Sequence, residues 1–172
     1  TLPRETLLER IAFGSCLHQR VPQPIWKSVL AANPQLFLMM GDNVYGDVSD
    51  ASLKEMIAAY DAQAQQPELA AAREQIPFLA TWDDHDFGYN DAVGDFPHKA
   101  GTRKLFAKYW NILEASLPDG GVYRSEIFGP EGRRVRRRAP RGRRADGRAD
   151  RVGAGGGDRA ARRHRPRAPP RR

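Results

Sequence analysis

The chain has 172 residues, which is enough for one domain with a buried core. Its net charge of +7 averages two opposite parts: residues 1–132 hold 11 Lys and Arg against 18 Asp and Glu, whereas residues 133–172 hold 17 Arg against 3 Asp. The single cysteine, Cys16, excludes an internal disulfide, and no stretch is long and apolar enough to span a bilayer.

Residues 1–132 alternate strand-like and helix-like segments. Short apolar runs indicate strands, and apolar residues spaced three or four apart indicate amphipathic helices. In chain order the patterns predict a strand over 10–15, a helix over 22–33, a strand over 35–40, helices over 49–66 and 67–74, a strand over 76–82, a helix over 101–116 and a strand over 121–128. In the helix over 49–66, Leu53, Ile57 and Tyr60 are expected to share the buried face. This order predicts an α/β fold with parallel neighbouring strands.

Residues 133–172 form a second segment of different composition. From residue 135 onward the chain uses only Val, Arg, Ala, Pro, Gly, Asp and His. Such a segment cannot bury enough apolar surface to offset chain entropy, so it is predicted to be a disordered Arg-rich tail. Two interpretations stay open: a frameshifted reading, because these residues have GC-rich codons, or a basic tail that binds nucleic acid non-specifically.

Polar clusters follow three of the predicted strands: GSC, GDNVYGD and WDDHDFGYND. In sheets with parallel strands, ligands collect beyond the C-terminal strand ends. Crowded carboxylates repel one another, so something must offset the negative charge of the third cluster. A bound metal cation would do so. His18 and His98 lie in polar segments and are assigned no role in the chemistry.

The clusters contain a varied set of metal donors. Cys16 offers a thiolate, Asp42 and Asp84 offer carboxylates, Tyr45 offers a phenolate and His85 offers an imidazole. Taken singly, each has an ordinary structural interpretation, such as a buried cysteine, a turn aspartate or a packed tyrosine. Their joint position at strand ends favours a metal site.

The segments IAFGSC, LFLMMGDNVYGD and PFLATWDDHDFGYND resemble the PhoD-like alkaline phosphatases of the calcineurin-like metallophosphoesterase superfamily, over residues 8–132. The resemblance implies part of a four-layer α/β/β/α sandwich of two facing mixed sheets. It implies a metal-dependent phosphoric ester hydrolase, in which a metal-activated water attacks the phosphorus of a small phosphate ester. Iron (Fe³⁺) and calcium are the implied metals, with zinc or manganese as alternatives. It also implies a periplasmic or secreted protein, although TLPRETLLER does not have the features of a signal peptide.

The same resemblance assigns metal-binding roles to individual residues. Asp42 would bridge two metals, Cys16 and Tyr45 would bind the iron, and Asp84 would bind the second metal.

It also assigns catalytic and substrate-binding roles. His85 would be the catalytic histidine near the leaving group, with Asp86 orienting it, and Asn43 and Asn90 would contact the substrate or the groups that support the site residues.

The resemblance also implies a missing part. The family takes further His and Asp ligands from later strands, and the residues after Arg134 offer none that fit. The chain is therefore expected to be truncated and impaired in activity. Two alternatives are an Arg-rich nucleic-acid-binding protein and a catalytically dead metallophosphoesterase-like domain.

Overall fold

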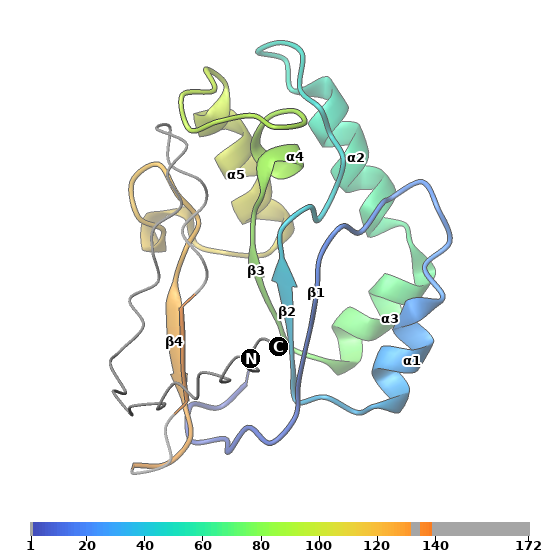
Figure 1. Ribbon diagram of the computed structural model, residues 1–172, viewed down its shortest axis with the longest axis vertical. Helices are drawn as coiled ribbons and strands as arrows, with labels where there is room; N and C mark the ends of the chain where they lie inside the picture. Colours follow the sequence, from blue (N-terminus) through green and yellow to red (C-terminus); the bar gives the residue numbers. More distant parts are fainter. Residues whose placement is uncertain (1, 132–134, 139–172) are drawn as a thin grey trace, which may run out of the picture.

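The structure, a computed structural model, describes residues 2–131 and 135–138 (Figure 1). Its centre is a sheet of three parallel strands in the order β1-β2-β3, which cover Ile11–Gly14, Leu36–Met40 and Phe78–Thr81. The register pairs Ile11 with Leu36 and Phe37 with Phe78. Because the strands are parallel, their C-terminal ends lie at one edge of the sheet. The predicted α/β fold with a parallel sheet is confirmed.

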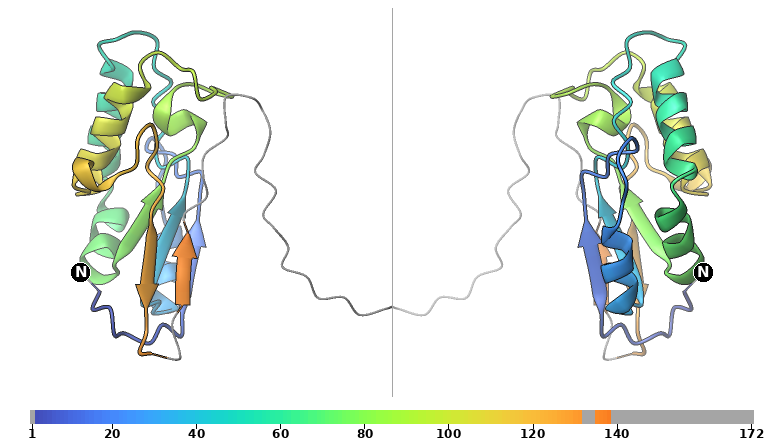
Figure 2. Two further views of the ribbon diagram at one scale, coloured as in Figure 1. Left: turned by 90° about the vertical axis from the view of Figure 1, so that its left-hand side faces the viewer. Right: turned by 90° about the vertical axis from the view of Figure 1, so that its right-hand side faces the viewer.

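Helices cover one face of this sheet (Figure 2). They are α1 (Ile25–Ala31), α2 (Lys54–Ala64), α3 (Pro67–Gln75) and α5 (Lys99–Tyr109), with a short 3₁₀ helix η1 at Glu114–Ser116. Each of the four longer helices places a large apolar side chain in the main core, which also contains Phe37 and Met39 of β2: Trp26, Met56, Leu69 and Phe106. No helix formed by the described residues is both long and apolar enough to cross a bilayer.

The buried face of α2 differs from the predicted one. Ile57 is exposed, whereas Met56, Ala59, Tyr60 and Gln63 are buried. Of the two predicted residues that lie within the helix, Ile57 and Tyr60, Tyr60 alone faces the core. The reason is that α2 begins at Lys54 and packs against α3 and α5, which decides its orientation. A buried glutamine therefore lies on the core side of this helix.

The opposite face of the sheet is only partly covered by the described residues. Side chains alternate along a strand, so Leu36 and Leu38 point away from the helices. Phe128 packs there with Leu8 and Leu36 in a small second core. Elsewhere on this face, Phe13 is 68% exposed.

Phe128 belongs to β4 (Ser125–Phe128), which pairs antiparallel with β5 (Val135–Arg138). Four residues of the predicted disordered tail form β5, in which main-chain pairing satisfies backbone N–H and C=O groups whatever the side chains are, and disorder of the tail stays a prediction. The rest of the predicted tail, and any nucleic-acid binding by it, lies outside the described residues. The described strands form one three-stranded and one two-stranded sheet, so the four-layer sandwich stays a prediction.

Candidate metal centre

The loops that follow β1, β2 and β3 meet at the C-terminal edge of the sheet. Beyond the strands, the backbone N–H of Cys16 donates to Gly41 O at 3.3 Å, and that of Leu17 donates to Asp42 O at 2.8 Å. The N–H of Val48 donates to Gly88 O at 2.8 Å, which ties the second loop to the third. The three polar clusters of the sequence are thus held together by main-chain bonds.

One group of side chains converges on Asp42 Oδ2. The thiol of Cys16 donates to this oxygen at 3.5 Å, and the hydroxyl of Tyr45 donates to it at 3.4 Å. These three residues come from the loops after β1 and β2. They form one possible set of ligands, consisting of sulfur, phenol oxygen and carboxylate oxygen.

A second group shares the same aspartate. Ligand atoms of Asp42, Asp84 and His85 lie within 4.8 Å of one another, and all three side chains are partly buried. The other carboxylate oxygen, Asp42 Oδ1, is buried and has no hydrogen-bond partner among the described residues. Asp42 therefore lies between two groups of possible ligands, and one of its oxygens accepts no hydrogen bond from the described part of the chain.

The protons at this centre are held more tightly than in water. Burial raises the pKa of Asp42, and the charges of Asp84 and Asp83 add to the rise, against a hydrogen bond from Cys16 and the charge of His85. Burial also raises the pKa of Tyr45, with further contributions from Cys16 and Asp42. A bound cation stabilises crowded anionic groups, because its positive charge offsets their mutual repulsion. The donor set and the unsatisfied Asp42 oxygen fit a metal ion.

His85 pairs with Asp47, not with Asp86. Its Nδ1 lies 2.6 Å from Asp47 Oδ1, and its imidazole is mostly buried. Burial lowers the pKa of His85, but the hydrogen bond and charge of Asp47 outweigh that effect, and the net pKa is raised. The prediction that Asp86 orients His85 is therefore wrong. Asp47 was not singled out in the sequence, although it closes the segment GDNVYGD.

Asp86 has a different place, inside the short helix α4 (Asp84–Phe87). Its side chain is 0% exposed and accepts hydrogen bonds from the N–H groups of Asn43, Val44 and Asp83, and from the Asn43 amide. Burial raises the pKa of Asp86 to about 7, and these donors oppose the rise. Asp86 points away from His85 because its four donors lie in the loop after β2 and at the start of α4.

Asn43 is 1% exposed, and its amide nitrogen donates to Thr81 O at 2.8 Å and to Asp86 Oδ2 at 2.9 Å. Its amide N–H groups are used inside the protein, so it holds Asp86 and β3 instead of facing a substrate. Asn90 is exposed and donates to Asp91 Oδ2 at 2.8 Å. Its contact with a substrate stays a prediction. Asp84 accepts a hydrogen bond from the N–H of Asp91.

Three non-glycine residues of the centre adopt left-handed backbone conformations: Cys16 at φ 59°, Asp42 at φ 49° and Asp47 at φ 41°. This region is sparsely populated by L-residues and costs of the order of 1 kcal/mol per residue. Such residues persist where the surrounding structure holds them, and they cluster at functional sites.

His18 also belongs to this neighbourhood, although the sequence analysis gave it no role. Its ring stacks on that of Tyr45 with 5.0 Å between centroids, and Tyr45 lies against His85 at 4.3 Å. Two histidines therefore flank the tyrosine ring. No spacing rule in the sequence links His18 to the second cluster, so the tertiary structure alone reveals the contact.

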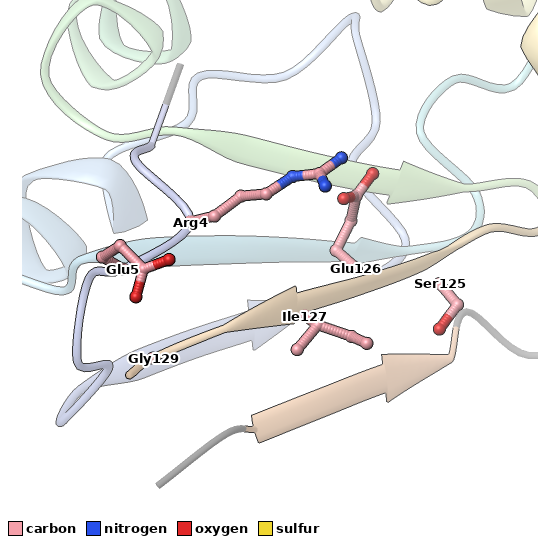
Figure 3. A pocket seen from close by; sticks show the side chains of 6 residues that line it. All are labelled: Arg4, Glu5, Ser125, Glu126, Ile127 and Gly129. Atoms are coloured by element: carbon pink, nitrogen blue, oxygen red, sulfur yellow. The ribbon is translucent and has the colours of Figure 1, made fainter. Parts of the chain in front are cut away.

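A cavity of about 340 Å³ lies elsewhere, between the N-terminal segment and β4 (Figure 3). Its lining residues are Arg4, Glu5, Ser125, Glu126, Ile127 and Gly129, and none of the predicted site residues is among them. The guanidinium of Arg4 points toward the carboxylate of Glu126 in Figure 3. The described lining mixes both charges and brings no set of metal donors together, so the strand-end centre remains the candidate site.

No family model matches the chain, and no curated protein matches it. Among solved structures, a chain described as "Structure of PhoD" is similar, with a TM-score of 0.62 and 18% sequence identity over 73% of this chain. The matched region spans 30% of the PhoD chain. At this identity the similarity concerns the fold: the chain has a mixed α/β fold with a parallel sheet, similar to part of PhoD.

Proposed function

We propose that the described residues form part of the catalytic centre of a metal-dependent phosphoric ester hydrolase of the PhoD-like type. The observation that supports this most is the shared position of Asp42. One of its oxygens accepts hydrogen bonds from Cys16 and Tyr45, and a ligand atom of the same side chain lies near Asp84 and His85. A carboxylate between two donor groups suits a bridge between two cations.

Cys16, Tyr45 and Asp42 would hold the first cation, and Asp42 and Asp84 would hold the second. Thiolate and phenolate donors favour a transition metal, which we take to be iron, and oxygen donors at the second position suit calcium. Zinc and manganese are the alternatives. Cations bound there would neutralise the charge of a phosphate group and lower the pKa of a water.

Among the described residues, His85 is the one best placed for proton transfer. Asp47 engages Nδ1, which leaves Nε2 as the nitrogen that gives a proton to the leaving oxygen of a phosphate ester. Asp47 fixes the orientation of the ring and raises the pKa of His85, so that more of the imidazole is protonated near neutral pH. A small phosphate ester is the proposed substrate class.

The test is the hydrolysis of p-nitrophenyl phosphate and bis(p-nitrophenyl) phosphate by the full chain supplied with Fe³⁺ and Ca²⁺. Asp42→Asn is expected to reduce turnover by orders of magnitude and to lower the bound metal, with an unchanged circular dichroism spectrum. Asp61→Asn, an exposed position on α2, is the matched control and should behave as the wild type. Equal activity and equal metal content in wild type and Asp42→Asn would reject the assignment.

A metal-binding domain without hydrolytic activity is a second candidate, because the match spans 30% of the PhoD chain. The same experiment separates the two functions. Metal bound in proportion to Asp42, with no hydrolysis of either ester, would favour the binding domain.

A further inference from the structure

Three buried glutamines, Gln19, Gln23 and Gln63, lie behind the candidate metal centre. A buried amide costs free energy unless its donors and acceptor are satisfied. These side chains come from the segment before α1 and from α2, and none of them is a metal ligand. Their hydrogen bonds reach the two loops that carry Cys16, Asp42 and Tyr45.

Gln63 joins the two loops with a single amide. Its Nε2 donates to Asn43 O at 3.1 Å and to Leu17 O at 3.5 Å. These carbonyls belong to the residues directly after Asp42 and Cys16. A change at Gln63 would therefore release both ligand-bearing loops at once, although its side chain touches neither ligand.

The orientation of the Gln63 amide is set by a chain of hydrogen bonds. The indole of Trp26 can only donate, and its Nε1 donates to Gln23 Oε1 at 2.9 Å. The Gln23 amide is thereby turned so that Nε2 donates to Gln63 Oε1 at 2.8 Å. Gln63 must then present its own nitrogen to the two loop carbonyls. Each donor in this chain of hydrogen bonds therefore meets an acceptor, from Trp26 on α1 to the loops of the metal centre.

Gln19 holds the third ligand. Its side-chain amide makes two bonds to the backbone of Tyr45: Nε2 donates to Tyr45 O, and Oε1 accepts from Tyr45 N, each at 3.0 Å. Gln66, just after α2, donates to Gln19 O at 2.6 Å. The tyrosine backbone is thus fixed by a side chain from the loop after β1.

We propose that Gln19 and Gln63 are positioning residues, which hold Cys16, Asp42 and Tyr45 in a ligating arrangement before any cation binds. The inference rests on the proposed metal centre. Its physical reason is the left-handed backbone at Cys16 and Asp42, which relaxes unless neighbouring groups hold it. When the ligands are already in place, metal binding does not have to supply the free energy that orders the two loops. Loss of the glutamines therefore weakens metal binding.

The experiment compares the full chain with Gln63→Met and Gln19→Met, which keep the length of the side chain and lose its hydrogen bonds. The matched control is Gln35→Met, because Gln35 also bonds to main-chain atoms, at Leu7, Glu9 and Arg10, but next to the N-terminal end of β2. Two readouts are taken. The first is amide hydrogen exchange at Leu17, whose N–H donates to Asp42 O and contacts no glutamine side chain. The second is titration with Co²⁺, followed by its thiolate charge-transfer absorption with Cys16.

In Gln63→Met, exchange at Leu17 is expected to accelerate by about 10-fold or more, and the Co²⁺ dissociation constant to rise by about 10- to 100-fold, the range usual for groups that orient metal ligands. Gln35→Met should stay within about 2-fold of the wild type in both readouts, because it lies far from the loops. If Gln63→Met does not fold, the Co²⁺ dissociation constant of Gln19→Met gives the same test, because that variant frees the backbone of Tyr45.

Two contrary results have different meanings. Unchanged exchange and unchanged Co²⁺ binding in both folded variants would overturn the positioning role and leave the metal centre intact. If the wild type, like the Cys16→Ala variant, gives no thiolate absorption with Co²⁺, the proposal of a metal centre is rejected, and the inference with it.

Discussion

Asn43 provides the sharpest test of the buried part of the site, because the sequence left open whether it contacts a substrate or supports other site residues, and its side chain is buried. The perturbation is Asn43→Leu, which has a similar volume and no polar atoms. It removes the donor to Thr81 O at 2.8 Å and one of the donors to the buried carboxylate of Asp86, at 2.9 Å. Each buried acceptor left unsatisfied costs about 1–3 kcal/mol, more for a charged group. Asp86 Oδ2 keeps the N–H of Asp83 as a donor, so the main cost is the unsatisfied Thr81 O, and the free energy of unfolding should fall by about 2 kcal/mol.

The assay is urea unfolding of the metal-free protein, followed by tryptophan fluorescence and circular dichroism and extrapolated to water. Asn90→Leu is the control, since Asn90 is exposed and its amide donates to its neighbour Asp91, and it should change stability by no more than about 0.5 kcal/mol. A loss below about 1 kcal/mol for Asn43→Leu, with an unchanged slope, would refute the reasoning that Asn43 supports Asp86 and β3.

Three further outcomes are expected. Asp47→Asn should lower the raised pKa of His85, measured from the ring-proton shifts of the metal-free protein; an unchanged midpoint would show that Asp47 is not its partner. Burial raises the pKa of Asp42 and raises that of Asp86 to about 7, so the metal-free fold binds these two protons more tightly than the unfolded chain does. The contribution of these two carboxyls to stability is therefore fully present below the unfolded value of 3.8 and is lost as the pH rises toward 7; a wild-type urea midpoint that gains on that of Asp86→Asn across this window would contradict the assignment. Phe13→Ser should reduce the fluorescence of a bound apolar dye, because Phe13 is 68% exposed on the partly covered sheet face; equal fluorescence would place the dye elsewhere.

The strands could be predicted because their signal is local. Runs such as LFLMM need no distant contact to be recognised, and a strand order interrupted by helices implies parallel pairing with its C-terminal ends at one edge. That edge is where the Cys16, Asp42 and Asp84 loops meet. The four-residue helix α4 was not predicted, because its residues DHDF have no apolar period and the fold of the loop depends on Asp86 receiving donors from another loop.

Residue identity and the position of a strand end are local properties, so the amino-acid order was enough to tell which donor types follow each strand. Which carboxylate meets which partner depends on packing between distant segments. His85 faces Asp47 and Asp86 faces Asn43 because strand register and the left-handed backbone at Asp42 and Asp47 aim these side chains. The same holds for Gln63, whose amide reaches Asn43 O and Leu17 O only because α2 packs with that side inward. Contacts between residues 20 to 46 positions apart follow from packing, which no local pattern in this chain encodes.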